Sequence, residues 1–218
     1  MIFVNYKTYP SGTGQASIAL TKILEEVAHE TQIKIVPVVQ ALDIKDVVSN
    51  TSLEVWTQKV DAVEPGAHTG SILAEGVIED GAAGTFLNHS EMKFPNFDEL
   101  AKASDRAKAV GLKTLIFAAN PQELKDISSL TPAYLAYEPP ELVGSATTSV
   151  ASRPEVIKEA SEIAKMANIP LIVGAGVHSS DDVKKCLENG AVGIAVASDI
   201  MKAEDPKKEL LELTKGFE

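Results

Sequence analysis

The chain has 218 residues, of which 44% are hydrophobic and 23% charged, a composition typical of a globular protein long enough to bury a sizeable core. Its formal net charge of −11 argues against nucleic acid or an anionic membrane as a partner. A lone cysteine, Cys186, excludes a disulfide framework and a thiolate metal site.

The beginning of the sequence does not resemble a targeting segment. Met1 leads directly into an apolar run, and the first lysine is Lys7, which is unlike a signal peptide. No apolar run approaches the ~18 residues that a membrane span needs. We therefore expect a cytoplasmic protein without a membrane partner.

Short runs of β-branched and apolar residues recur along the chain and predict strands. The expected strands cover residues 2–5, 33–38, 53–57, 84–87, 114–118, 134–137, 171–173 and 192–196. The longer runs are continuously apolar rather than alternating, which is typical of parallel strands covered on both faces.

Amphipathic segments separate these runs and predict helices. The clearest patterns cover residues 15–28, 97–110, 154–167, 180–188 and 206–215, and weaker ones cover 41–48, 71–78 and 121–127. Asn96 and Pro154 mark helix starts, and Gly111 and Gly190 mark helix ends.

This alternation predicts a closed (β/α)₈ barrel, formed by a single domain over residues 1–218. The main alternative is an open doubly wound sheet, which usually has a Gly-x-Gly-x-x-Gly turn after its first strand. Here the first strand runs into Asn-Tyr-Lys-Thr-Tyr-Pro, and Gly12 and Gly14 come too late for that turn. The barrel is therefore favoured.

Reactive side chains follow several predicted strands. Asn5, Tyr6 and Lys7 follow the first strand, His89 follows the fourth, and Glu138 follows the sixth. Taken singly, each of them most often has a structural or solvent-exposed role. The carboxyl ends of barrel strands meet at one rim and form the active site there. Their recurrence at this rim therefore favours a catalytic site.

Two of these residues have informative neighbours. Pro-Pro directly after Glu138 fixes two φ angles, forbids a helix there and stiffens the loop. A helix start at Ser90-Glu91 is expected after His89, and its backbone N–H groups would disfavour the imidazolium form.

Small residues follow the last three strands. Gly144 lies in the loop after the sixth strand, Gly176 in the loop after the seventh, and Ala197 and Ser198 after the eighth. Turn geometry explains some of them. Backbone N–H groups reach an anion only where side chains are small, and barrels commonly bind phosphate with the loops after strands seven and eight. Together with Lys7, these groups would let an acidic protein bind an anion locally.

Three sequence blocks carry a family resemblance. Asn-Tyr-Lys at 5–7, Asn-His-Ser-Glu at 88–91 and Ala-Tyr-Glu-Pro-Pro-Glu at 136–141 resemble triosephosphate isomerase in its short archaeal form. The resemblance extends from the first strand to the last helix. It implies a TIM barrel that interconverts dihydroxyacetone phosphate and D-glyceraldehyde 3-phosphate through an enediolate, in glycolysis and gluconeogenesis, without a cofactor or metal.

The same resemblance implies a role for each reactive residue. Glu138 would be the base that moves a proton between two carbons, and neutral His89 the electrophile that polarises the carbonyl. Lys7 would stabilise negative charge, and Asn5 would position Lys7 and the substrate. Glu91 would be a structural or assisting carboxylate near Lys7. A lid over about 139–148 would exclude water from the enediolate.

The phosphate contacts are where this chain departs from the family's long form. Gly-Ala-Gly-Val follows strand seven where Gly-Gly-Ser is common, Ala-Ser-Asp follows strand eight where Gly-Gly is usual, and Met-Lys replaces arginine after Ser-Glu. The substrate-binding residues are expected to be Asn5, Tyr6, Lys7, Val143, Gly144, Gly176, Ala197 and Ser198.

The segment at 66–70, Gly-Ala-His-Thr-Gly, resembles the loop that family members push into a neighbouring subunit. This resemblance implies a homodimer, or a homotetramer as in archaeal relatives that pair dimers. Thr69 would then lie at the interface and support Asn5 or Lys7 of the neighbour.

Two other functions remain open at this point. A barrel aldolase or synthase acting on another sugar phosphate would need a lysine within a strand or several metal ligands. Lys34 and Lys113 lie toward the wrong ends of their strands, and only Glu138 and His89 converge. A non-catalytic phosphate-binding barrel would share the fold and the anion site.

Overall fold

The strands close into a barrel that follows the order of the sequence. Within residues 1–139 and 150–218, which the computed structural model describes, eight parallel strands pair with their sequence neighbours, and β1 closes the ring against β8. The strands are β1 Ile2–Asn5, β2 Ile35–Val39, β3 Trp56–Thr57, β4 Gly84–Leu87, β5 Lys113–Ala118, β6 Tyr134–Tyr137, β7 Leu171–Gly174 and β8 Gly193–Val196. The predicted closed (β/α)₈ barrel is confirmed.

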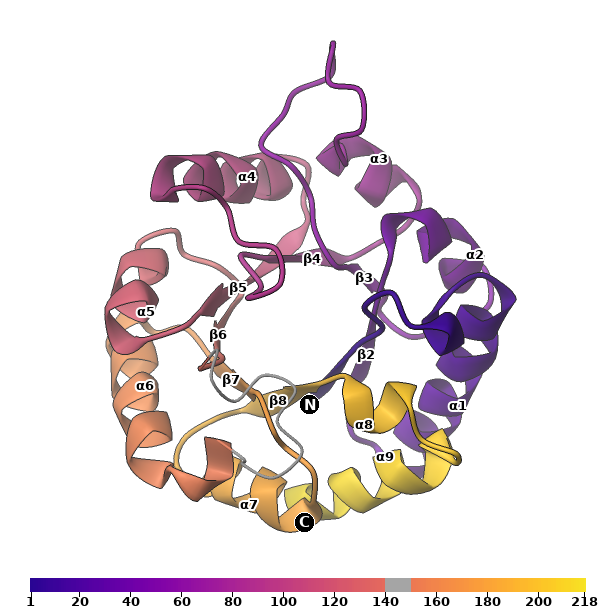
Figure 1. Ribbon diagram of the computed structural model, residues 1–218, viewed down its shortest axis with the longest axis vertical. Coiled ribbons are helices and arrows are strands. Elements are labelled where there is room, and N and C mark those ends of the chain that lie inside the picture. The colour runs from indigo at the N-terminus through magenta and orange to yellow at the C-terminus, as the bar shows by residue number, and fades with distance from the viewer. Residues whose placement is uncertain (140–149) are drawn as a thin grey trace.

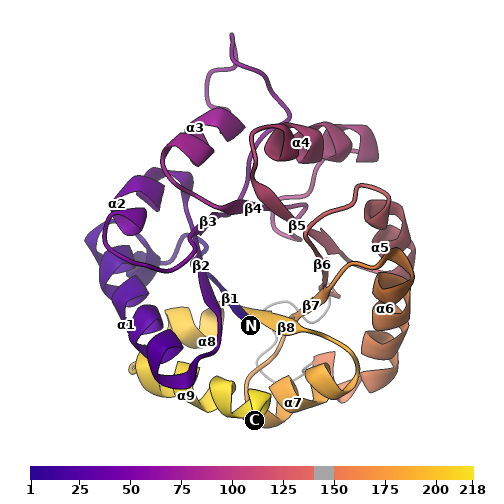
Figure 2. The same ribbon diagram turned by 180° about the vertical axis from the view of Figure 1, so that it is seen from behind.

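Helices surround the ring of strands, as seen from one end in Figure 1 and from the other in Figure 2. They are α1 Gln15–Thr31, α2 Ile44–Val48, α3 Ala74–Glu79, α4 Phe97–Ala109, α5 Pro121–Ser128, α6 Pro154–Ala167, α7 Ser180–Glu188, α8 Ser198–Met201 and α9 Pro206–Thr214. Short 3₁₀ turns cover Pro10–Gly12, Ala41–Asp43, Val150–Ser152 and Lys215–Phe217. The loop between β3 and α3 projects outward from the ring (Figure 1).

Local sequence signals place most helix boundaries correctly. The Asn96 side chain accepts a hydrogen bond from the Glu99 N–H at the start of α4, and Pro154 is the first residue of α6. Gly111 and Gly190 have φ angles of 93° and 98° after their helices, a conformation that costs glycine least. Two predictions need correction: β3 is only two residues long, and the helix expected at 41–48 begins as a 3₁₀ turn.

Aromatic side chains fill the barrel interior. The Phe3 and Trp56 ring centroids lie 5.1 Å apart, and those of Phe86 and Phe117 lie 4.9 Å apart, both in edge-to-face arrangements. Gly84 makes room for this packing, because a side chain at that position would collide with the Trp56 ring. The interior is therefore a packed core up to the C-terminal ends of the strands.

A charged network closes the N-terminal end of the barrel. The Glu54 carboxylate accepts hydrogen bonds from Lys34 at 2.9 Å, Lys113 at 3.2 Å and the Trp56 indole at 2.8 Å. Burial alone would raise the pKa of Glu54, but these three donors outweigh it and lower the pKa to about 2. The two lysines are thus engaged at the end of the barrel opposite the reactive strand ends.

Glu54→Gln is expected to lower the free energy of unfolding at pH 7 by about 1–2 kcal/mol, less than the full pKa shift implies because water screens this partly exposed site. Since the folded-state pKa lies below the ordinary glutamate value of 4.5, the stabilisation is present above pH 4.5 and is lost as pH falls toward about 2. Urea unfolding of both proteins from pH 7 to pH 3 measures this difference. A difference that stays constant over this range would contradict the network's electrostatic role.

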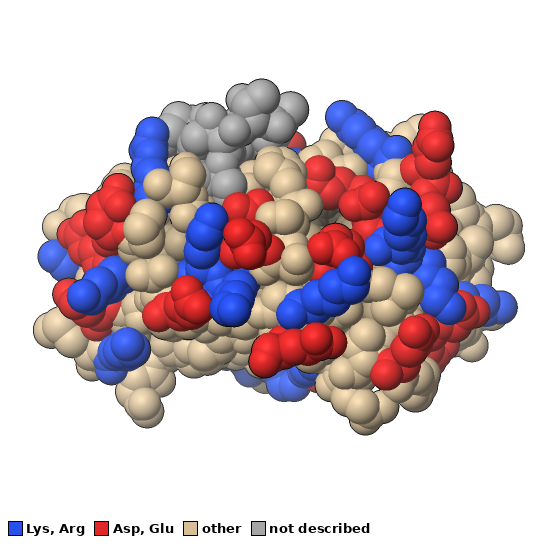
Figure 3. Space-filling view, turned by 90° about the horizontal axis from the view of Figure 1, so that it is seen from below, with Lys and Arg blue, Asp and Glu red and all other residues tan. Residues whose placement is uncertain are grey.

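The surface mixes both signs of charge. On the side of the molecule seen in Figure 3, lysine and arginine side chains are interspersed with aspartate and glutamate rather than forming a continuous basic face. In the part of the chain that the structure describes, no helix combines the length and apolarity that crossing a membrane would require.

Candidate active site

A cavity of about 470 Å³ opens at the C-terminal ends of the strands. Loops after β1, β4, β6, β7 and β8 contribute to its lining. Most of the predicted site residues line this cavity, namely Asn5, Lys7, His89, Glu138, Gly176, Ala197 and Ser198. The barrel thus brings together residues that are separated by up to 193 positions in the chain, Asn5 and Ser198 being the outermost pair.

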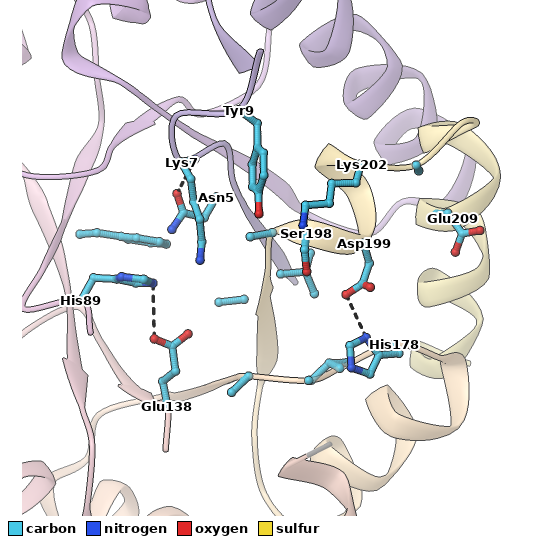
Figure 4. A pocket seen from close by; sticks show the side chains of 18 of the residues that line it. Asn5, Lys7, Tyr9, His89, Glu138, His178, Ser198, Asp199, Lys202 and Glu209 are labelled. Carbon is cyan, nitrogen blue, oxygen red and sulfur yellow. Dashed lines mark hydrogen bonds and ion pairs between the residues drawn. The ribbon is translucent and has the colours of Figure 1, made fainter. Parts of the chain in front are cut away.

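Glu138 and His89 face each other across the cavity (Figure 4). His89 Nε2 lies 3.4 Å from Glu138 Oε2, and the Ser90 hydroxyl donates a 2.9 Å hydrogen bond to the same oxygen. Both residues are nearly buried, at 9% exposed for His89 and 7% for Glu138. Gly174 leaves space for the carboxylate, since a Cβ there would lie 3.0 Å from Glu138 Oε1.

The His89 ring is held in one orientation and one tautomer. The Glu91 backbone N–H donates a 3.2 Å hydrogen bond to His89 Nδ1, so the proton of the neutral ring resides on Nε2, which faces Glu138. Phe117 packs edge-to-face against the ring, with centroids 4.8 Å apart. The predicted helix start at Ser90 is wrong, because the chain makes a turn there in which the Met92 N–H donates to the His89 carbonyl. A backbone N–H nevertheless faces the imidazole.

Lys7 adopts an unusual backbone conformation at the cavity edge. Its φ of 46° lies in the left-handed region that non-glycine residues rarely occupy. The Lys7 N–H donates to Asn5 Oδ1 at 3.0 Å, and the Gln58 side-chain amide donates to the Lys7 carbonyl at 2.8 Å. Lys7 Nζ lies 2.7 Å from Glu91 Oε1, the carboxylate that the family resemblance implied near it.

A hydrogen-bond network centred on the buried Asn88 anchors the loop that carries His89. The Asn88 side-chain amide donates to the Phe117 carbonyl at 3.0 Å and to Glu123 at 2.9 Å. Lys93 reaches both Glu123 carboxylate oxygens, at 2.8 and 2.9 Å. Burial alone would raise the pKa of Glu123, but Lys93, the Ala119 N–H and Asn88 together lower it. Lys93 thus ties the β4 loop to α5.

Small residues line the side of the cavity that the segments after β7 and β8 form. Ala175 and Gly176 have consecutive positive φ angles of 75° and 65°, so the chain turns sharply at the cavity edge. Ala197 and Ser198 lie beside them at the start of α8. Val143 and Gly144, with the lid expected to extend to residue 148, lie outside the described residues.

Tyr6 does not reach the cavity, contrary to the expectation that it binds substrate. Its side chain is fully buried in the core, and its hydroxyl forms a 2.7 Å hydrogen bond with Thr21 of α1. Successive side chains of a strand point to opposite faces, so Asn5 faces the cavity while Tyr6 packs outward against the helix. Burial raises the pKa of the Tyr6 phenol accordingly.

Several residues near the reactive groups were not assigned a role from the sequence. Ser90 contacts Glu138, Gln58 holds Lys7, and Tyr9, His178 and Asp199 line the cavity. Gln58 directly follows β3, so its position at a strand end was a usable signal. The other contacts depend on loop paths that short-range sequence patterns do not specify.

Comparison with known proteins agrees with this geometry. The family model for triosephosphate isomerase matches residues 1–216. Triosephosphate isomerase of Methanocaldococcus jannaschii is 35% identical over 217 residues, covering 99% of each chain. The enzyme of Metallosphaera sedula is 38% identical over 217 residues, covering 99% of this chain and 95% of that protein.

Among solved structures, triosephosphate isomerase from Bartonella henselae is similar with a TM-score of 0.74, covering 99% of this chain and 98% of that one. Its sequence identity of 18% supports the fold alone. The family model and the archaeal relatives show the family as well as the fold. The model matches nearly the whole chain, and both relatives are at least 35% identical over 217 residues. The chain therefore belongs to the triosephosphate isomerase family.

Proposed function

We propose that this protein interconverts dihydroxyacetone phosphate and D-glyceraldehyde 3-phosphate, acting in glycolysis and gluconeogenesis. The observation that carries the proposal is the pairing of Glu138 with the Nε2 of His89 across one cavity. Moving a proton between two adjacent carbons requires a base above the carbons and a donor at the oxygens. This pair supplies both groups, and the family match supports the assignment.

Glu138 and His89 carry each proton transfer of the proposed reaction. The Glu138 carboxylate takes the proton from carbon 1 of dihydroxyacetone phosphate, and the electron pair moves to the carbonyl oxygen to give an enediolate. The Nε2–H of His89 donates to that oxygen and moves the proton between the two oxygens. Protonated Glu138 then returns a proton to carbon 2, which completes the aldehyde.

Lys7 and Asn5 are proposed to stabilise this charge. An ammonium group at the cavity edge lowers the energy of both the enediolate and the phosphate dianion. Lys7 is fixed for this role by its contacts with Asn5 and Gln58 on the backbone and Glu91 on the side chain. Burial of the reacting groups raises the strength of these interactions and excludes water from the enediolate.

We infer that the phosphate binds beside Gly176, Ala197 and Ser198. Backbone N–H groups in tight turns form anion-binding concavities, and the sharp turn at Ala175 and Gly176 suits this role. Barrels commonly bind phosphate with the loops after strands seven and eight. Val143 and Gly144 remain proposed contacts from the loop after β6.

Gly176→Val is expected to weaken phosphate-analogue binding by about 10-fold or more, because a branched side chain is strained at positive φ and occupies the cavity edge. The inhibition constant of a phosphate analogue measures the effect. Gly111→Val, which meets similar strain at a φ of 93° outside the cavity, is the control. Unchanged inhibition in Gly176→Val would remove this turn from the phosphate site.

The isomerase activity itself is tested by a coupled assay on the pure protein without added metal or cofactor. Turnover of dihydroxyacetone phosphate is the expected result. Phosphate binding without turnover would instead identify a non-catalytic barrel. An aldolase is not favoured, because Lys34 and Lys113 are engaged with Glu54 at the opposite end of the barrel.

We also infer one domain over 1–218, a cytoplasmic location, and a homodimer or homotetramer. The loop that carries Thr69 projects from the barrel between β3 and α3, as Figure 1 shows, and is suited to reach a neighbouring subunit. Size-exclusion chromatography with light scattering measures the assembly. A purely monomeric, fully active protein would exclude a role for Thr69 at an interface.

A further inference from the structure

The loop after β7 and the start of α8 are joined by a side-chain contact at the cavity wall. His178 Nδ1 lies 3.1 Å from Asp199 Oδ2, and both residues line the cavity (Figure 4). His178 is two positions beyond Gly176, and Asp199 directly follows Ser198. The contact therefore connects the two segments that carry the proposed phosphate contacts.

One end of this contact is attached to the scaffold. The His178 backbone N–H donates a 3.0 Å hydrogen bond to Asp182 Oδ2 in the first turn of α7. Ser179 caps the same helix, accepting from the Asp182 N–H at 3.2 Å. The His178 backbone is thus fixed against α7, so its imidazole restrains Asp199, and with it α8, at a set spacing from the β7 loop.

We propose that His178 and Asp199 form a clasp that holds the β7 loop and α8 at the spacing that phosphate binding requires. This is a positioning role, which rests on the proposed function. Neighbouring backbone segments bind an anion jointly only if their separation is fixed before the anion arrives, because the cost of ordering them would otherwise be subtracted from the binding free energy.

Because Asp199 is charged, the direction in which phosphate affinity changes when Asp199 is removed tests the clasp. A carboxylate on the wall of a cavity that receives a phosphate dianion repels it, so removing the charge alone would tighten binding. Removing a clasp would weaken binding, because the two segments would lose their set spacing. The Asp199→Ala variant should therefore bind phosphate more weakly if the clasp exists, and more tightly if Asp199 only repels the anion.

The experiment measures binding of inorganic phosphate to the full chain by ³¹P NMR titration, for wild type, Asp199→Ala, His178→Ala and the double variant. Asp199→Ala is expected to weaken binding by about 3–10-fold, the range for losing one hydrogen bond. The same variant should raise KM for triose phosphate similarly while leaving kcat little changed. The double variant should lose less than the product of the two single losses, because the residues act as a pair.

Two further variants separate the clasp from other effects. Asp199→Asn removes the repelling charge but keeps the shape and a hydrogen-bond acceptor for His178, so it should bind phosphate more tightly than Asp199→Ala does. Asp181→Ala removes an 83% exposed carboxylate from the same turn of α7 and should leave phosphate affinity unchanged. Circular dichroism confirms that each variant is folded.

Equal or tighter phosphate binding in Asp199→Ala, or independent losses in the double variant, would overturn the clasp. These outcomes are distinct from failure of the proposed function, which would show as absent turnover in the wild-type protein. Because phosphate binding is measured directly, the clasp is tested even if the substrate differs from triose phosphate.

Discussion

Glu138→Gln is expected to lower kcat by about 10³–10⁴-fold, because an amide keeps the shape of the side chain but cannot accept the substrate proton. The variant should keep a KM within a few-fold of wild type, since the cavity and its phosphate-binding side are unchanged. Steady-state kinetics in both directions measure the effect. Circular dichroism should show an intact barrel.

The matched control is Glu159→Gln, which makes the same chemical change on an exposed position of α6. Its kcat should equal that of wild type. If Glu138→Gln retained more than a tenth of wild-type kcat, another group would be the base, and the facing pair of Glu138 and His89 would have no catalytic meaning.

His89→Gln is expected to lower kcat by about 10²–10³-fold, the usual effect of removing one donor to a developing oxyanion. Glutamine does not offer an N–H that is held by the Glu91 backbone and the Phe117 ring as the imidazole is. KM should change little, because His89 contacts the reacting oxygens rather than the phosphate.

His29→Gln on the exposed face of α1 is the control for this substitution and should leave both constants unchanged. A wild-type kcat in His89→Gln would remove His89 from the mechanism. A large rise in KM with unchanged kcat would instead make His89 a binding residue.

The barrel was largely predictable because its signals are local and repeated. Parallel strands covered on both faces appear in the sequence as apolar runs. Start signals such as the Asn96 cap and Pro154 in the first helical turn place helix starts within a few residues. The short β3 was not predictable, because its length is set by which residues pair with the neighbouring strands, and only Trp56 and Thr57 do so. The residues of β3 do not themselves indicate how many of them pair with a neighbouring strand.

The reactive residues were predictable as a set of strand ends, but their mutual contacts were not. Topology places the ends of parallel strands at one rim, which brings Glu138 and His89 together without any detail of packing. Reading Asn5, Tyr6 and Lys7 as one motif ignored the alternation of side chains along β1, and Tyr6 was misplaced for that reason.

Contacts between loops required the structure. Ser90 with Glu138 and His178 with Asp199 join residues 48 and 21 positions apart in the chain. Their geometry depends on turns whose φ angles, as at Ala175, are unusual for the residue type. A sequence pattern does not specify such turns, because the surrounding fold rather than local preference stabilises them.

The most direct test of the account follows hydrogen during turnover in D₂O. A base that takes the substrate proton exchanges part of it with solvent before returning it, so glyceraldehyde 3-phosphate formed from dihydroxyacetone phosphate should carry deuterium at carbon 2, as measured by NMR after trapping. Glu138→Gln should slow product formation and exchange together, by about 10³–10⁴-fold. Product without any solvent deuterium, or exchange that continues at the wild-type rate in Glu138→Gln, would contradict proton transfer by this carboxylate.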